Sequence, residues 1–210
     1  SVAAMVRKLI RRQIGYDLPG VSPLLNRLYV GRGIVDNQEL DNSLANLIPP
    51  DSLKGIGQAV SILGEALKTR SKILIVGDFD ADGATSSALM VSGLKAMGAQ
   101  DVDYLVPDRF KFGYGLTPEI VEVALGFSPE VIVTVDNGIS SMEGVQTALD
   151  NDIKVIITDH HLSGPELPPA DAVVNPNQKG CNFPSKSIAG VGVAFYLLTA
   201  LRAFLRETGW

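Results

Sequence analysis

Five short apolar runs after residue 70 predict the strands of a single sheet. The runs are Ile73–Val76, Val102–Val106, Val131–Val135, Val155–Thr158 and Ala172–Val174. Segments of helical period separate the first four, which is typical of a parallel sheet with helices on both faces. Because the runs read as apolar throughout, we expect every strand to be buried on both sides.

Local signals predict where the helices of this region begin and end. Gly98 ends the first connecting helix. Thr117-Pro118-Glu119 starts the second with an N-cap and a proline at the first helical position. Ser140-Ser141-Met142-Glu143 has the form of a capping box that starts the third. A long last helix is expected from about Ile188 to Arg206.

The N-terminal part predicts helices and turns. Apolar residues recur there at helical spacing among basic ones, at Val6, Leu9, Ile10 and Ile14. Pro49-Pro50 interrupts the chain, and helical period returns over Leu53–Leu67. We therefore expect a helical extension over residues 1–52 and an α/β domain over residues 53–210, built on a parallel five-stranded sheet flanked by helices.

Acidic residues and histidines directly follow the predicted strands. The first strand leads to Asp78, Asp80 and Asp82, the third to Asp136, and the fourth to Asp159, His160 and His161. In an open parallel sheet, ligands bind at the carboxyl ends of the strands, which share one edge. An isolated aspartate after a strand is usually a cap or turn residue. Three clusters at three strand ends instead predict a common site.

Such a site favours divalent metal ions. Five carboxylates close together repel one another, so cations stabilise their ionised forms. Oxygen ligands suit Mg²⁺ or Mn²⁺, and added imidazoles favour Mn²⁺. Two ions about 3.5–4 Å apart can activate a water and stabilise the leaving oxygen of a phosphoester. Since neighbours on an extended chain point in opposite directions, we expect one of His160 and His161 to bind metal. The other would contact substrate or a carboxylate.

Composition and charge add little beyond this. The net charge is −5, and without the five strand-end aspartates it would be zero, so the acidity does not exclude a nucleic-acid substrate. Cys181 is the only cysteine, which excludes an internal disulfide and fits a reducing compartment. The sequence has no apolar run near the roughly 20 residues that span a bilayer and no signal-peptide pattern. We expect a cytoplasmic protein without a membrane segment.

Three motifs resemble those of the DHH phosphoesterases: GDFDADG, TVDNGIS and ITDHH. The segments VPDRFKFGYGL and SIAGVGVAFYLL are similar to the RecJ-like branch of that family. The resemblance implies a Mn²⁺- or Mg²⁺-dependent exonuclease with two ions. Such an enzyme removes 5′-mononucleotides from the 5′ end of single-stranded DNA, in DNA repair and recombination. A single-strand-binding protein and a helicase are the partners it suggests.

The resemblance also implies roles for individual residues. The metal ligands would be Asp80, Asp82, Asp136, Asp159 and His160, with Asp78 a ligand or a neighbour of one. His161 would contact the scissile phosphate, and a metal-bound water would be the nucleophile.

Weaker candidates lie around this set. Arg109, Gly190 and Gly192 are candidates for binding substrate phosphate, the glycines through free N–H groups at a helix start. Phe110, Phe112 and Tyr114 are candidates for base stacking. Each candidate has a structural alternative. The arginine could simply be exposed on a loop, the glycines could allow close packing of the helix on the sheet, and the aromatic residues could anchor a loop.

Other readings remain open. Members of the RecJ-like branch continue with a further acidic motif, a DHH-associated domain and often an OB-fold, so we expect this chain to be truncated before its last motif. Its own activity is then in question, and a silent module that binds single strands or a partner is one alternative. Another DHH phosphoesterase, such as an oligoribonuclease, a cyclic-dinucleotide phosphodiesterase or a pyrophosphatase, is a second. A phosphatase with Asp78 as covalent nucleophile is the third.

Overall fold

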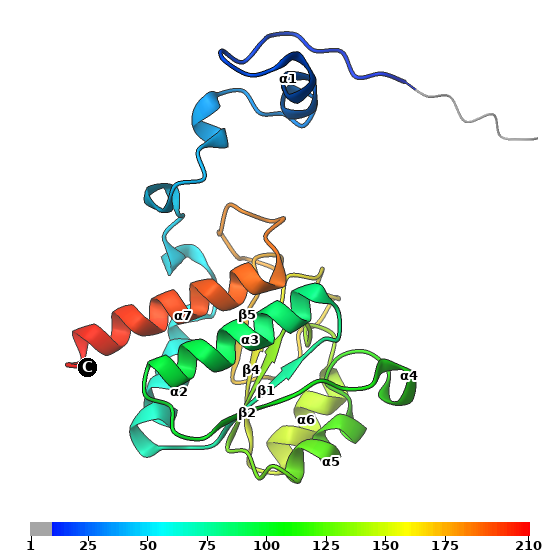
Figure 1. The fold of residues 1–210 in the computed structure, drawn as a ribbon. Helices are drawn as coiled ribbons and strands as arrows, with labels where there is room; N and C mark the ends of the chain where they lie inside the picture. The colour runs from blue at the N-terminus through cyan, green and yellow to red at the C-terminus, as the bar shows by residue number, and fades with distance from the viewer. Residues whose placement is uncertain (1–9) are drawn as a thin grey trace, which may run out of the picture. The chain divides into compact units, whose positions relative to one another are not determined.

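The structure, a computed structural model, describes residues 10–210, except for the side chain of Arg109. These residues form two compact units, one ending at Ile48 and the other comprising Pro49–Trp210. Figure 1 traces both.

The first unit holds one α-helix, α1 (Pro23–Val30), and two 3-10 turns, η1 (Asn37–Leu40) and η2 (Leu44–Asn46). The helix predicted from residues 6–14 is wrong where it can be examined, because residues 10–18 form no helix; residues 1–9 lie outside the described part. Long-range bonds hold this segment along α1 instead. The guanidinium of Arg12 donates to the carbonyl of Gly31, and the hydroxyl of Tyr16 donates to that of Ile34.

The second unit is built on a five-stranded parallel sheet. Its strands are β1 (Ile73–Gly77), β2 (Val102–Leu105), β3 (Val131–Val135), β4 (Lys154–Thr158) and β5 (Ala172–Val174), in the order β2-β1-β3-β4-β5. All four pairings are parallel. The predicted fold class is confirmed, and each strand differs from its predicted span by at most one residue at either end.

Helices cover both faces of this sheet (Figure 1). One layer contains α2 (Ile56–Thr69), α3 (Ala81–Ala96) and α7 (Gly190–Glu207), and the other contains α5 (Pro118–Leu125) and α6 (Met142–Asp150). Short turns η3 (Pro50–Ser52) and α4 (Arg109–Phe112) complete the unit. The second layer packs Ile120 and Val145 on Leu74 and Val76 of β1, all buried. Each such side chain contributes about 1.5–3 kcal/mol to stability.

Several helix signals act as predicted. Gly98 follows α3 with a φ of 96°, a left-handed conformation that glycine adopts at little cost. The hydroxyl of Thr117 caps α5 by accepting from the amide of Ile120, and Pro118 occupies the first helical position. These signals depend on a few neighbouring residues, which explains why the sequence alone reveals them.

Two expectations are wrong. α6 begins after Ser141 as predicted, but the side chain of this N-cap residue makes no capping bond. Its Oγ accepts instead from the amide of Leu116, 3.0 Å away on the neighbouring loop. β2 is not buried on both faces, since Tyr104 is 58% exposed. β2 is an edge strand with a partner on one side only, so the helices cover it less completely than the central strands.

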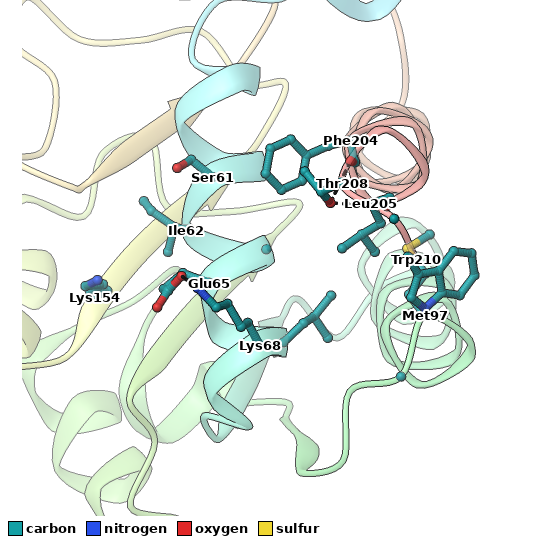
Figure 2. A pocket seen from close by; sticks show the side chains of 14 residues that line it. Ser61, Ile62, Glu65, Lys68, Met97, Lys154, Phe204, Leu205, Thr208 and Trp210 are labelled. Atoms are coloured by element: carbon teal, nitrogen blue, oxygen red, sulfur yellow. Dashed lines mark hydrogen bonds and ion pairs between the residues drawn. The ribbon is translucent and has the colours of Figure 1, made fainter.

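A large cavity lies at the amino edge of the sheet. Its volume is about 870 Å³. Figure 2 shows Lys154 at the start of β4, Met97 after α3 and Trp210 after α7 around it. The acidic strand-end residues are at the opposite, carboxyl edge. None of the helices within residues 10–210 is long and apolar enough to cross a membrane.

Candidate metal centre

The aspartates lie at the point where the order of the strands reverses. The chain passes from β1 to β2 on one side and then returns to β3 on the other. Ligands bind at such a switch point, outside the carboxyl ends of the strands. Asp78 and Asp80 follow β1, and Asp136 follows β3. The crossover places acids from both halves of the sheet in one crevice.

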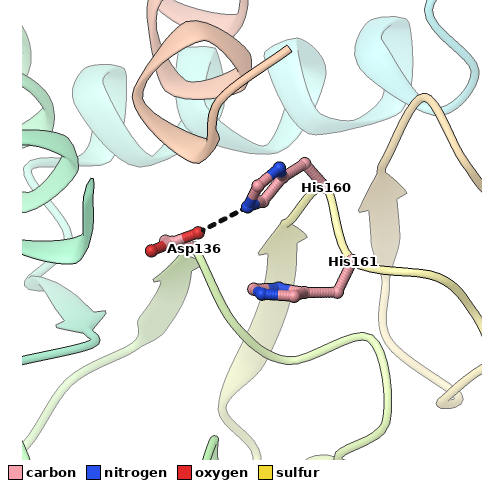
Figure 3. A group of neighbouring side chains, drawn as sticks. All are labelled: Asp136, His160 and His161. Carbon is pink, nitrogen blue, oxygen red and sulfur yellow. Dashed lines mark ion pairs between the residues drawn. The ribbon is translucent and has the colours of Figure 1, made fainter. Parts of the chain in front are cut away.

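Two groups of possible metal ligands form there. Asp136, His160 and His161 bring ligand atoms within 4.8 Å of one another, and so do Asp78, Asp80 and Asp136. Figure 3 shows the first group, with both imidazoles facing the carboxylate. Asp136 belongs to both groups. A carboxylate has two oxygens, so Asp136 could bind two neighbouring ions, as in sites that hold a pair of ions about 3.5–4 Å apart.

The ionised form of the Asp136 carboxylate is unfavourable when no cation is near. Its side chain is buried, and its Oδ1 has no hydrogen-bond partner among the described residues. Nε2 of His160 lies 3.1 Å from that oxygen, and the two form an ion pair only if the imidazole is protonated. Burial, and then the charges of Asp82 and Asp80, raise the pKa of Asp136 to about 7. Its backbone is also left-handed, with a φ of 61°, a strained state that is common at functional sites.

Asp80, a member of the second ligand group, and the nearby Asp82 also accept hydrogen bonds from backbone amides at the starts of helices. Asp80 is the N-cap of α3 and accepts from the amide of Gly83 at 2.9 Å. Asp82 reaches across to α7, where its two oxygens accept from the amides of Gly190 and Val191 at 2.7 and 2.8 Å. A carboxylate at a helix N-terminus is stabilised by the free amides and the helix dipole. Asp82 therefore fixes the start of α7 beside the crevice.

Asp159 holds His161 in place. It is fully buried, and its Oδ1 lies 2.7 Å from Nδ1 of His161. It also accepts from the amides of Ile139, His160 and His161. Burial alone would raise the pKa of Asp159, but these hydrogen bonds, above all the one from the His161 ring, lower it. The same bond raises the pKa of His161. With Nδ1 engaged, His161 can present only Nε2 to the crevice.

The two histidines lie on the same side, contrary to expectation. Their ring centroids are 4.6 Å apart, and both rings are grouped with Asp136. The prediction assumed an extended chain, but β4 ends at Thr158 and the chain bends at His161. The bend turns both side chains into the crevice.

Three asparagines that sequence reasoning did not select support this arrangement. Nδ2 of Asn137 donates to the carbonyls of Val76 and Val135, and so joins the ends of β1 and β3. Asn175 and Asn177 donate to the backbone carbonyls of His161 and His160. Asn137 stands beside Asp136 in the motif TVDNGIS, so its position was a signal. The other two are 14 and 17 residues from their partners, which no local pattern reveals.

The glycine candidates do not have the free N–H groups that were expected. The amide of Gly190 donates to Asp82, and that of Gly192 donates to the carbonyl of Ala189 at 2.9 Å. Close packing is instead evident at Gly190. A Cβ there would lie 2.5 Å from Oδ1 of Asp136, closer than such contacts occur. Gly190 allows α7 to approach the shared carboxylate.

The remaining candidates differ in position. The side chain of Arg109 lies outside the described part of the chain. Phe110 is 98% exposed, whereas Phe112 packs against the core. The hydroxyl of Tyr114 lies 3.3 Å from Nδ1 of His161 and donates to the carbonyl of Asp136 at 3.2 Å. Tyr114 is the member of this aromatic trio that the structure brings to the crevice.

The side chains present fit divalent ions. The ligand atoms are carboxylate oxygens with added imidazole nitrogens, which suit Mn²⁺ and also Mg²⁺. The buried Oδ1 of Asp136 lacks a hydrogen-bond partner among the described residues, as expected for an atom that binds a cation. The fit depends on the ligands alone, and it does not select between the two metals.

Comparison with known proteins supports this reading. Residues 72–208 match the N-terminal domain of the DHH family. The chain is 53% identical over 206 residues to the single-stranded-DNA-specific exonuclease RecJ of Escherichia coli K12, covering 97% of this chain and 36% of that protein. It thus spans about a third of the length of this relative.

Two solved structures are also similar. RecJ of Thermus thermophilus in complex with Mn²⁺ is 37% identical, with a TM-score of 0.68 over 85% of this chain and 24% of that one. The same protein in complex with Mg²⁺ gives 32% identity and a TM-score of 0.54 over 85% of this chain and 21% of that one. The family match covers more than half of the chain and includes every strand and the whole acidic crevice, so this chain belongs to the DHH family.

Proposed function

We propose that the full-length protein hydrolyses phosphodiester bonds of single-stranded DNA from the 5′ end and releases 5′-mononucleotides in DNA repair and recombination. The observation that carries this is Asp136, shared by two ligand groups at the switch point. The polarity and the substrate rest on the similarity to RecJ proteins, which are named as single-stranded-DNA-specific exonucleases. Because the chain spans only 36% and 23% of the length of these two relatives, the activity is proposed for the full-length protein.

The proposed ions are Mn²⁺ or Mg²⁺, with which RecJ structures of Thermus thermophilus have been solved. Asp78 and Asp80 would hold one ion, His160 the other, and Asp136 both. When bound, two such ions lower the pKa of a water molecule and stabilise the leaving oxygen. Asp82 and Asp159 were also predicted as ligands. The contacts of Asp159 favour a role in positioning His161. Each carboxylate oxygen of Asp82 accepts one backbone hydrogen bond and has a further lone pair with which it could bind a metal ion.

The protein side chains then orient the reaction. Asp159 fixes the His161 ring so that Nε2 faces the crevice, where a raised pKa favours the charged imidazolium. A positive donor at this position would hold the scissile phosphate and balance its developing charge. Asn137 keeps the ends of β1 and β3 together, which maintains the spacing between the two ligand groups.

Broader expectations accompany this proposal. Residues 53–210 would carry the chemistry, and residues 1–52 would be an extension. A single-strand-binding protein and a helicase are the partners we propose, on the strength of the single-stranded substrate. We propose that the activity is cytoplasmic.

The test uses the full-length protein, Mn²⁺ and single-stranded DNA labelled at either end. We expect mononucleotides from the 5′ end, little digestion of duplex, and at least a 1,000-fold slower reaction for Asp136→Asn (about 4 kcal/mol of activation free energy). Asp103→Asn, on the edge strand away from the crevice, is the matched control. Release from the 3′ end, or full activity in Asp136→Asn, would contradict the proposal.

A substrate panel separates the rivals. Faster hydrolysis of short oligoribonucleotides, cyclic dinucleotides or pyrophosphate would favour another DHH phosphoesterase. A trapped phosphoryl group on Asp78 would favour a covalent phosphatase. Binding of single strands with no turnover would favour a silent module.

A further inference from the structure

A second cavity opens directly beside the metal centre and has no part in the mechanism above. Its volume is about 500 Å³, enough for one nucleoside. Asp159 and His161 form one end of it, and the rest comes from residues 114–119 and 138–144. We refer to it as the lateral cleft. Because His161 belongs both to the ligand cluster and to the lining of this cleft, a group bound there would lie next to a phosphate held at the metals.

The two loops that form the lateral cleft are fixed to each other. Ser141 Oγ accepts from the amide of Leu116 at 3.0 Å. A Cβ on Gly144 would lie 2.0 Å from the carbonyl oxygen of Leu116, so the loop and the start of α6 are packed as closely as backbone allows. Tyr114 is bonded to the carbonyl of Asp136. The cleft is therefore a preformed feature tied to the metal centre.

The charges of the lateral cleft favour a phosphate only at its His161 end. His161 is the one basic side chain among the described residues that line the cleft, which include no lysine or arginine. Glu119 and Glu143 line the part away from His161 and Asp159, and their charges would repel an anion there. The occupant of that part is therefore expected to be uncharged or cationic.

The walls suit an aromatic ring with polar edges. Leu116, Ile139 and Met142 supply apolar surface, the ring of Tyr114 is 47% exposed, and Ser140 lies at an exposed position of the rim. Nucleobases stack on aromatic side chains and use hydroxyls and carboxylates for hydrogen bonds from their edges. A neutral base and its deoxyribose combine these properties.

We propose that the lateral cleft binds the nucleoside that carries the scissile phosphate on its 5′ oxygen. Of the two nucleosides joined by this phosphodiester, it is the one that keeps the phosphate when the bond to the other nucleoside's 3′ oxygen is broken. The inference rests on the proposed function, because it identifies the part of the substrate next to the metals. His161 stands at the junction, with the phosphate on the side of Asp136 and the sugar and base on the side of Leu116. The cleft thereby distinguishes a nucleotide from a bare phosphate.

Ser140→Trp tests this by filling the cleft from an exposed position. Ser61→Trp is the matched control, because Ser61 is also exposed and lines the cavity of Figure 2 at the opposite edge. The full-length protein with Mn²⁺ is titrated with thymidine 5′-monophosphate and, separately, with inorganic phosphate. We expect the wild type to bind the nucleotide at least tenfold more tightly. Ser140→Trp should abolish this preference and change the Kd for phosphate less than twofold, while Ser61→Trp should leave both Kd values unchanged.

Three results would overturn the inference: equal Kd values for the two ligands in the wild type, equal weakening of both by Ser140→Trp, or no effect of that variant. If Ser140→Trp does not fold, Met142→Glu is the second variant, since an acidic residue is favourable in the first turn of α6. It should abolish the same preference by replacing part of the apolar wall with a carboxylate. Exonuclease activity is measured in parallel, because a wild type that leaves single strands intact contradicts the proposed function whether or not the nucleotide preference is found.

Discussion

Oδ1 of Asp159 lies 2.7 Å from Nδ1 of His161 and links the buried end of β4 to a side chain at the metal centre. We predict that Asp159→Asn lowers kcat by about 10–100-fold, the effect usual for a partner that orients a functional histidine. The Kd for Mn²⁺ should change much less than in Asp136→Asn.

The distinguishing measurement is the pKa of His161, followed by NMR. Loss of the Asp159 charge should lower it from its raised value toward the ordinary 6.5, because the bond to Asp159 is the main cause of the shift. An unchanged pKa, or a loss of Mn²⁺ binding as large as in Asp136→Asn, would show Asp159 to be a ligand instead.

Gly190 is predicted to be essential for the position of Asp136. In Gly190→Ala the added methyl group would lie 2.5 Å from Oδ1 of Asp136, so α7 or the carboxylate must move. Overpacking of this kind costs about 1–3 kcal/mol, and we expect at least a tenfold weaker binding of Mn²⁺. Calorimetry measures both effects. Gly57→Ala, on α2 with no atom within 4 Å of the added group, should be neutral or stabilising.

Asp82 is predicted to stabilise the fold as well as the site. Asp82→Ala removes both acceptors from the amides of Gly190 and Val191. Loss of a helix cap costs about 0.5–2 kcal/mol, visible as a lower midpoint in denaturant with or without metal. Asp36→Ala removes a comparable cap from η1 in the first unit and should leave the unfolding of the second unit unchanged. Equal stability of Asp82→Ala and wild type would contradict the capping role.

Stability without metal should fall as the pH rises. The folded-state pKa of Asp136 is raised from 3.8 to about 7, so between pH 4 and pH 7 the native state binds a proton that the unfolded state has lost, and the free energy of unfolding decreases. His161 acts in the same direction, because its raised pKa makes a contribution that is complete below pH 6.5 and lost as pH rises through the raised value. Asp159, with a lowered pKa, contributes above pH 4 and adds no slope in this range.

Thermal unfolding in chelator at pH 5.5 and pH 8 measures the effect. We expect a lower Tm at pH 8, restored by Mn²⁺, and a much smaller difference in Asp136→Asn. A Tm in chelator that is higher at pH 8 than at pH 5.5 would contradict the assigned shift.

The sequence predicted the sheet well because each strand is a local apolar run, and the acids follow those runs directly. Asp82 and Gly190 show what local pattern cannot provide. They are 108 residues apart, and their bond exists only because α3 and α7 pack side by side. The histidine pair was misread for a related reason, since the bend at His161 depends on Asn175 and Asp159, which hold its backbone. Motif spacing thus identifies candidates for the site, whereas tertiary contacts determine which way each one faces.

The shared carboxylate of Asp136 makes the two ions interdependent. With a pKa of about 7, Asp136 must lose a proton before it can bind metal, and the first ion drives that loss. The second ion then meets a carboxylate that is already ionised and oriented. Metal binding should therefore be cooperative below pH 7, where Asp136 is mostly protonated, and this contribution should vanish at alkaline pH. At a fixed low concentration of Mn²⁺, the occupancy of the centre should rise as the pH rises toward 7.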